Sequence, residues 1–279
     1  MTHVFEVTGH LRVDCRLTVG EVRLVAAEPG HARVEVSAHG EGGEELIRRG
    51  EVAVHDDGSG RQRLVVHYPA KSLLSGVFSI TGRGGVDVTI HCPSGSDLQA
   101  RTGAAAVRAA LDLGAVDIVT GSGDVELRDV TGSAAIKVGS GQVRVGTVGG
   151  TAEIDTGAGG VDVARAGGTI KVRTASGRIR LGTTLESVKV TAAAGDVSID
   201  CAEQGHVAVT ATTGDIEIGV PRGRHLHLDV SSTIGSIRSE LEASDDVAAG
   251  GADLSLRVRA TTGDITLRRA VQPAASADA

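Results

Sequence analysis

Aspartates that directly follow a glycine are the residues of this chain whose type and spacing come nearest to metal chemistry. They occur in the pairs Gly123-Asp124, Gly195-Asp196, Gly214-Asp215 and Gly263-Asp264. Calcium-binding nonapeptide repeats share a nine-residue period and also carry glycine and aspartate at fixed positions. Gln142, Gly160 and Arg178 hold the equivalent position in the units between these pairs. Because Ca²⁺ requires roughly six to eight oxygen ligands, the interrupted row favours no metal site.

Turn formation explains the same residues without a metal. A glycine adopts positive φ at low cost, and an aspartate beside it accepts hydrogen bonds from neighbouring backbone amides. The turn residues predicted in this way are Gly123, Asp124, Gly141, Gly159, Gly177, Gly195, Asp196, Gly214 and Asp215.

Two further groupings could support chemistry. Glu126 and Asp162 are carboxylates of the kind that glycan-hydrolysing enzymes use in pairs, but their neighbours in the repeat are arginines, so ion pairing accounts for them. His225 and His227 would face the same side of a strand, yet no third metal ligand lies near them in the sequence. We therefore expect no catalytic residue, no metal, no cofactor and no enzymatic activity.

A period of nine residues organises the middle of the chain. Units of Gly-x-Φ-x-Φ, in which Φ is aliphatic, open at Gly114, Gly123, Gly132, Gly141, Gly150, Gly159, Gly168, Gly177 and Gly195. Apolar alternation predicts strands with one buried face, and a fixed period predicts stacked units. Two turn types alternate along the series, so the full repeat consists of two nine-residue units, or eighteen residues. The pattern predicts an all-β fold, a parallel β-solenoid (β-helix) with two strands per coil.

Outward positions of units that are one full repeat apart carry ordered charges. Equivalent residues of neighbouring coils lie about 4.8 Å apart, so unlike charges there stabilise the stack. The expected charge ladder, a structural or interaction face, comprises Glu126, Arg144, Asp162 and Arg180 on one sheet and Glu153, Lys171 and Lys189 on the other. The competing fold is an antiparallel meander of nine-residue units. It would place Ala135 between Glu126 and Arg144 and lose the ladder.

The aromatic residues separate an N-terminal region from the repeats. Phe5, Tyr68 and Phe78 all precede residue 80, and the inward positions of the repeats are aliphatic. Two sheets about 10 Å apart are filled by β-branched side chains and overfilled by rings. We therefore predict an antiparallel β capping region over 1–80, solenoid repeats over 81–268 and a disordered tail over 269–279.

Composition narrows the choice of partners and compartment. The net charge of -7 and an aromatic content of 1% argue against a nucleic-acid surface. No stretch has the 18 or so apolar residues of a membrane span, and Met1–His10 lacks the features of a signal peptide. We expect the cytoplasm, with an envelope association by an unrecognised route as the alternative. Cys15, Cys92 and Cys201 are predicted to be free thiols.

The repeat motifs resemble those of a known family. The segments that carry the resemblance are Pro93-Ser94-Gly95-Ser96-Asp97-Leu98, Thr120-Gly121-Ser122-Gly123-Asp124-Val125, Thr174-Ala175-Ser176-Gly177, Ala194-Gly195-Asp196-Val197 and Thr213-Gly214-Asp215-Ile216. They are similar to the bacterial β-strand-repeat domain of unknown function that is catalogued as a "putative adhesin", over roughly residues 10 to 268. The resemblance implies a β-solenoid with a surface, envelope-associated or interaction role, and it transfers no catalytic residue.

The function that we expect is that of a non-enzymatic β-solenoid scaffold or adhesin-like binding protein. Such a protein would present its charge-patterned sheet face to a protein or cell-envelope partner whose identity the sequence does not give. One alternative is a self-assembling, filament-forming solenoid that associates end to end, since open coil ends tend to associate unless capped. The other is a glycan-acting β-helix enzyme.

Overall fold

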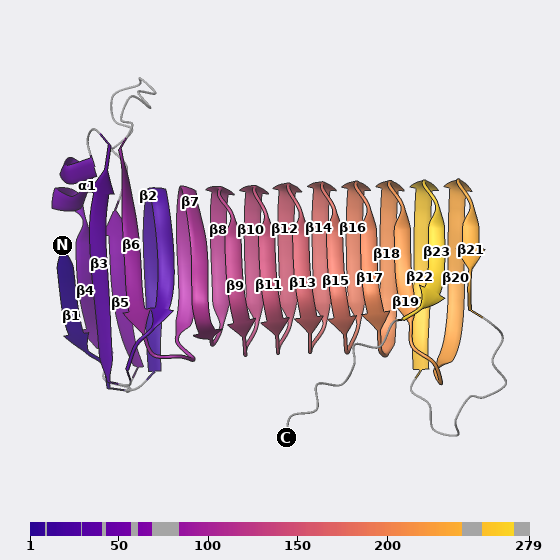
Figure 1. Ribbon diagram of the computed structural model, residues 1–279, viewed down its shortest axis with the longest axis horizontal. Helices are drawn as coiled ribbons and strands as arrows, with labels where there is room; N and C mark the ends of the chain where they lie inside the picture. The colour runs from indigo at the N-terminus through magenta and orange to yellow at the C-terminus, as the bar shows by residue number, and fades with distance from the viewer. Residues whose placement is uncertain are drawn as a thin grey trace. The chain divides into compact units, whose positions relative to one another are not determined.

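The computed structural model describes residues 1–8, 10–28, 30–40, 43–56, 61–68, 84–241 and 253–270 (Figure 1). The chain forms two compact units, Met1–Val145 and Gly146–Ala279. The described residues of both units are mostly β-strands, with one short helix among them, α1 (Gly43–Arg49). Phe78 and residues 271–279 of the predicted tail lie outside the described residues.

Unit 1 contains an antiparallel edge and the first parallel coils. Its strands are β1 (Thr2–Glu6), β2 (His10–Ala26), β3 (His31–His39), β4 (Glu51–Asp56), β5 (Arg61–Tyr68), β6 (Gly85–Cys92), β7 (Asp97–Leu113), β8 (Val116–Ser122), β9 (Val125–Val130), β10 (Ala134–Ser140) and the start of β11 (Val143–Val148). The first half of the long strand β2 pairs in parallel with β5 and its second half with β6. Strand β7 pairs in parallel with both halves of β2.

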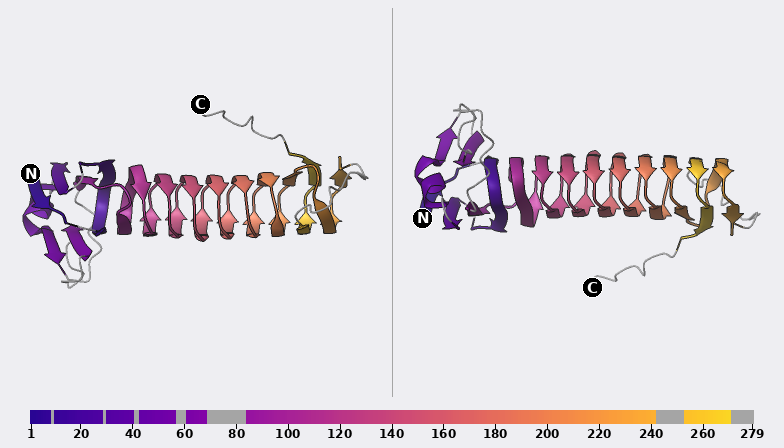
Figure 2. Two further views of the ribbon diagram at one scale, coloured as in Figure 1. Left: turned by 90° about the horizontal axis from the view of Figure 1, so that it is seen from below. Right: turned by 90° about the horizontal axis from the view of Figure 1, so that it is seen from above.

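Unit 2 also consists of two-strand coils. Its strands are β12 (Ala152–Ala158), β13 (Val161–Ala166), β14 (Ile170–Ser176), β15 (Ile179–Thr184), β16 (Val188–Ala194), β17 (Val197–Ala202), β18 (Gly205–Thr213), β19 (Ile216–Val220), β20 (His225–Ile234), β21 (Ile237–Ser239), β22 (Asp253–Thr262) and β23 (Ile265–Arg269). Figure 2 shows the strands of successive coils in two facing rows.

The register confirms the predicted parallel β-solenoid with eighteen residues per coil. In unit 1, Val107 lies opposite Val125 in a parallel pair. In unit 2, Ile170 lies opposite Val188. Each strand therefore pairs with the strand two positions away in the sequence, and the antiparallel meander of nine-residue units is excluded for these coils.

Aliphatic side chains fill the space between the two sheets, as the alternation predicts. The inward residues Val161 and Val163 of β13 and Ile179 and Leu181 of β15 are buried, whereas Asp162 between the first two is exposed. A β-strand directs successive side chains to opposite faces, so each strand contributes every second residue to the core. The free energy of folding of each coil thus depends on aliphatic contacts with its neighbours.

The N-terminal region combines antiparallel and parallel pairing. Strands β1 and β3, β3 and β6, and β4 and β5 form antiparallel pairs. Strand β2 differs from the predicted antiparallel pattern, because it already belongs to the parallel stack. Tyr68 is buried against Gly50, where any added side chain would overlap its ring, and Phe5 stacks on His3 with ring centroids 6.3 Å apart. The domain boundaries at 80 and 268 stay a prediction.

The order of the last coils in space differs from their order in the sequence. Strand β18 pairs in parallel with β22, and β19 pairs with β23. Strands β20 and β21 pair with the other edges of β22 and β23. The segment 253–269 is therefore inserted between two coils that precede it in the chain, as the yellow strands between the orange ones show (Figure 1).

Glycine is required at the corners where the chain turns from one sheet to the other. Gly141 has φ of 143°, and a Cβ there would lie 2.4 Å from the carbonyl oxygen of Gly123 on the preceding coil. Gly177 has φ of 136°, and its Cβ would lie 2.1 Å from the carbonyl oxygen of Gly159. These positions need both the positive φ and the absence of a side chain.

Replacing Thr120 by valine is expected to raise the free energy of unfolding by about 1 kcal/mol. The Thr120 hydroxyl is buried without a hydrogen-bond partner, and Val138 occupies the opposite position on the next coil. Valine removes the unpaired hydroxyl and keeps the side-chain shape. Urea unfolding measures the change, and Val138→Thr, the reverse substitution, should destabilise. A clear loss of stability in Thr120→Val would show that the hydroxyl has a partner.

Candidate functional site: the charged outer faces

The predicted charge ladder lies on the outer faces of unit 2 at the expected register. Asp162 is opposite Arg180, and Glu153 is opposite Lys171, which is followed by Lys189. The Lys171 Nζ donates to the Glu153 carboxylate at 2.9 Å. This hydrogen bond and the charge of Lys171 hold the pKa of Glu153 below its ordinary value.

Side chains outside the predicted ladder share its ion pairs. Arg180 Nη2 contacts Asp200 Oδ2 at 3.2 Å, and no ion pair between Arg180 and Asp162 is formed in the described part of the chain. Asp200 lies two residues after Ser198, which is opposite Arg180. Because a long arginine reaches diagonal neighbours, register alone does not determine which carboxylate it pairs with.

In unit 1 the ladder begins earlier in the chain than predicted. Arg108 lies opposite Glu126 and contacts it at 3.6 Å, and it also contacts Glu21, its diagonal neighbour on β2. The Val125 amide donates to the Gln142 carbonyl at 2.8 Å, the same pattern that joins Val107 to Asp124. It aligns Glu126 with Arg144, as the spacing of one full repeat requires.

The turn aspartates bind backbone amides of the next coil. Asp124 Oδ1 accepts from the Gln142 amide at 2.8 Å, and Asp196 Oδ1 accepts from the Asp215 amide at 3.2 Å. Asp215 in turn accepts from the Asp264 amide at 2.8 Å. The turn residues Gly123, Gly141, Gly159, Gly177, Gly195 and Gly214 all have positive φ. These residues therefore lie in the coil corners.

The remaining candidates for chemistry stay apart. Within the described ranges, no group of three or more His, Cys, Asp or Glu residues is arranged to hold a metal ion. His225 and His227 are exposed on β20, opposite Asp253 and Ser255. The three cysteines are free and buried, and burial raises the pKa of Cys15 to about 12 and those of Cys92 and Cys201 to about 11. Thiols with such pKa values are poor nucleophiles.

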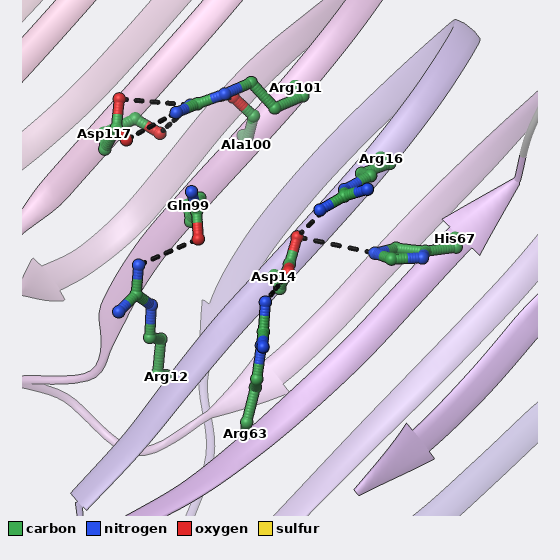
Figure 3. A network of polar contacts seen from close by, with 9 residues as sticks. All are labelled: Arg12, Asp14, Arg16, Arg63, His67, Gln99, Ala100, Arg101 and Asp117. Atoms are coloured by element: carbon green, nitrogen blue, oxygen red, sulfur yellow. Dashed lines mark hydrogen bonds and ion pairs between the residues drawn. The ribbon is translucent and has the colours of Figure 1, made fainter. Parts of the chain in front are cut away.

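A group of arginines lies around one buried carboxylate on neighbouring strands of unit 1 (Figure 3). We call it the Asp14 cluster, and it comprises Arg12, Asp14, Arg16, Arg63, His67, Gln99, Arg101 and Asp117. Strands β5, β2, β7 and β8 supply its members, and the register places Arg12 opposite Arg63 and Arg16 opposite both His67 and Arg101. Cationic side chains thus face one another across three neighbouring strands.

Asp14 joins three members of the cluster, Arg16, Arg63 and His67. Its side chain has no exposed surface, although it points to the outer face of β2. Arg63 hydrogen-bonds one carboxylate oxygen, and Arg16 Nε and His67 Nε2 each lie 3.5 Å from the other. Burial alone would raise the pKa of Asp14, but the hydrogen bonds of Arg63 and His67 and the charges of Arg63 and Arg16 lower it below its ordinary value.

The outer members of the cluster have other partners. Arg12 Nη2 donates to Gln99 Oε1 at 2.8 Å, so its guanidinium bonds a neutral amide. Arg101 binds the Asp117 carboxylate with both terminal nitrogens, one of them at 3.1 Å. About half of the side chain of Arg16 and of Arg63 is exposed to solvent. The cluster therefore presents cationic groups at the surface while its single central carboxylate is covered.

Asp14→Asn is expected to lower the free energy of unfolding by about 1 to 2 kcal/mol at pH 7, because it removes a charged acceptor of several hydrogen bonds whose donors are partly screened by solvent. The pKa of Asp14 is lower in the folded protein than its ordinary value of 3.8. The stabilisation that Asp14 contributes is therefore complete above about pH 4. It is lost as the pH falls through the lower pKa that Asp14 has in the folded protein.

Urea unfolding of wild type and Asp14→Asn at a series of pH values measures this dependence. The difference between the two proteins should be constant near neutrality and should shrink below about pH 4. Asp155→Asn is the control, because Asp155 is paired with Arg173 at 3.0 Å but is partly exposed. A difference at pH 7 no larger than that of the control would contradict the central role of Asp14.

Stacked parallel coils with turns held by glycine and aspartate, together with charged outer faces, define a β-solenoid repeat protein. The chain belongs to the Toastrack family, the domain of unknown function DUF4097, whose family model matches residues 59–268. No curated protein matches the chain. In the described residues no helix has the length and hydropathy needed to span a membrane.

Several solved bacterial structures are similar to this chain. A "putative adhesin" of Bacteroides fragilis has 15% identity and a TM-score of 0.49, with 96% of each chain covered. A "putative adhesin" of Parabacteroides distasonis has 12% identity and a TM-score of 0.39, and a "putative lipid binding protein" of the same species has 10% identity and a TM-score of 0.42. Both matches cover 95% of this chain and 96% of the other.

Proposed function

We propose that this protein is a non-enzymatic β-solenoid scaffold that binds an anion-bearing protein or cell-envelope component through a charged outer sheet face. The observation that carries the proposal is the Asp14 cluster, in which cationic side chains outnumber the carboxylates that contact them. Whether the protein acts in the cytoplasm or in association with the envelope stays a prediction.

The hydrogen-bonding capacity of the cluster supports an anionic partner. A guanidinium has five N–H donors, whereas a carboxylate offers about four acceptor sites. Arg16 and Arg63 share the Asp14 carboxylate with His67, and Arg12 has the neutral Gln99 as its hydrogen-bond acceptor. Donors therefore remain for an added carboxylate, sulfate or phosphate group, and such pairs with arginine are among the stronger hydrogen bonds in proteins.

The placement of the arginines also favours an anionic partner. Like charges directly opposite each other on neighbouring strands destabilise a sheet by about 0.2 to 1 kcal/mol per pair. The cluster contains two such arrangements, Arg12 with Arg63 and Arg16 with Arg101. An anion between them would offset this repulsion. The chain has a net charge of -7, so an anionic partner would be attracted to this cationic face and repelled by the rest of the surface.

Binding to defined polyanions tests the proposal. The full chain is titrated with polygalacturonate and with poly-glutamate, and neutral dextran serves as the uncharged reference. We expect saturable binding to at least one polyanion and none to dextran. The double variant Arg12→Ser/Arg16→Ser should bind about tenfold more weakly or worse, since hydrogen bonds to charged groups contribute about 1.5 to 3 kcal/mol each.

A matched double variant tests whether binding depends on the Asp14 cluster or only on the net charge of the protein. Arg178→Ser/Arg238→Ser removes the same charge from exposed positions of unit 2 that belong neither to the cluster nor to the ladder. It should bind as the wild type does within about twofold, a small change that fits screened surface charges. Absence of binding to both polyanions, or an equal loss in the two double variants, would refute the proposed binding face. Thermal melts of all variants verify that they are folded.

A further inference from the structure

The coil formed by β20 and β21 has a described neighbour on one side only. Its strands pair with β22 and β23, and no other described strand pairs with them. Interior residues of the inserted coil are buried, whereas Leu228 and Ile237, on the interior side of this coil, are 44% and 48% exposed. Ile234, at the corner opposite the exposed Thr262, is 64% exposed. Three of the seven large hydrophobic residues that are exposed in the described ranges thus belong to this single coil.

An open strand edge next to exposed aliphatic side chains is a site for strand pairing, because it offers unpaired backbone groups as well as apolar surface. We propose that the free edge of β20 pairs antiparallel with the same edge of a second copy of this chain. The resulting interface is isologous, so it closes after two copies and does not continue into a filament.

The sequence of β20 is self-complementary in one register. With the two-fold axis at Leu228, the two leucines face each other on the interior side, and Leu226 faces Val230 of the second copy. On the outer side His227 faces Asp229 of the second copy. The Oδ2 atom of Asp229 contacts Arg257 of β22 at 3.1 Å and Arg259 at 3.9 Å, and half of the Asp229 side chain stays exposed. A histidine opposite an aspartate and aliphatic residues opposite aliphatic residues are favourable cross-strand pairs.

Neighbouring registers are less favourable. Moving the axis to Asp229 would place the two aspartates directly opposite each other, which is destabilising. Moving it to His227 would shorten the overlap within β20 from residues 225–231 to residues 225–229. The length of the paired segment and the charge pairing therefore both favour the axis at Leu228.

Sedimentation of the full chain over a range of concentrations tests the association. We expect a reversible monomer–dimer equilibrium and no larger species. Leu228→Lys should weaken the dimer at least tenfold, because it places two ammonium groups opposite each other at the axis. The control Val119→Lys changes an exposed valine of β8 in unit 1 and should leave the equilibrium unchanged. Thermal melts show whether the variants are folded.

Cysteine cross-linking tests the register. Opposing residues of an antiparallel pair have Cα atoms about 4.5 to 5.5 Å apart, within the span of a disulfide. Leu228→Cys should form a covalent dimer under mild oxidation, whereas Leu226→Cys, on the same side of the strand, should not. The three native cysteines are buried and give little background. A monomer at every concentration, an oligomer that grows with concentration, or equal cross-linking of both variants would overturn the proposal.

Discussion

Val161→Asp is expected to lower the free energy of unfolding by about 3 to 5 kcal/mol, the cost of an uncompensated buried charge. Val161 is buried between the sheets, opposite Ile179 of the next coil, and its surroundings are aliphatic. A carboxylate at this position has no water and no partner, so it must either remain charged at high cost or take up a proton. In both cases the folded state loses stability relative to the unfolded chain.

The adjacent residue is the control for this substitution. Asp162 lies on the outer face, and Asp162→Asn should change the free energy of unfolding by less than about 1 kcal/mol. Urea unfolding followed by circular dichroism measures both variants. Two variants that unfold at the same urea concentration would show that the assignment of inward and outward residues in β13 is wrong.

Gly177→Ala is the second substitution with a large expected effect. The alanine Cβ would lie 2.1 Å from the carbonyl oxygen of Gly159, and the backbone has φ of 136°. The backbone conformation costs an L-residue about 1 to 3 kcal/mol, and the overlap, which pushes neighbouring coils apart, costs about 1 to 3 kcal/mol more. The summed loss of stability in Gly177→Ala is therefore comparable to that expected for Val161→Asp.

Gly223→Ala is the comparison without a stacked carbonyl oxygen, at a φ closer to the left-handed helical region. Gly223 also has positive φ, of 73°, but nothing lies within 4 Å of the Cβ that alanine would add. It should show the conformational cost alone and therefore lose less stability than Gly177→Ala in the same urea experiment. Equal losses would mean that the stacked carbonyl oxygen contributes nothing and that φ alone selects glycine at the corners.

The regular coils were predictable because one spacing determines both the buried face and the neighbour of each strand. Val107 and Val125, or Ile170 and Val188, are separated by the repeat itself, so alternation and period together give the register. The corner glycines and aspartates were predictable for the same reason. The positive φ of the glycine recurs at every second unit, and the hydrogen bond to a backbone amide occurs where an aspartate follows the glycine.

The Asp14 cluster was not predictable from that pattern. Arg63 on β5 and Gln99 on β7 are both distant from Asp14 in the sequence, and β2 carries no nine-residue repeat. The one available signal is the run Arg12-Val13-Asp14-Cys15-Arg16, in which polar residues alternate with apolar ones and a carboxylate lies between two arginines. That run indicates an outward-facing ion pair, but it does not reveal that arginines of other strands cover the carboxylate.

The order of the last coils was unpredictable for a different reason. The segments Gly235-Ser236-Ile237 and Gly263-Asp264-Ile265 carry the same kind of corner, and either can continue the stack. At each corner the amide after the glycine donates to an aspartate of the neighbouring coil: Ser236 to Asp264 at 2.7 Å, and Asp264 to Asp215 at 2.8 Å. Local pattern therefore allows both orders, and only the packing of whole coils decides between them.

The inserted coil makes assembly of the C-terminal end depend on synthesis of the final strands. A ribosome delivers residues 225–239 before residues 253–269, yet in the folded protein the later segment separates the earlier one from β18 and β19. Repeat proteins can fold coil by coil from the N-terminus during synthesis. In this chain, residues 225–239 must then either stay undocked or leave a temporary position on β18 and β19 when residues 253–269 arrive. Translation that stops before residue 253 thus yields a chain whose last coil lacks β22 and β23, the strands with which it pairs in the folded protein.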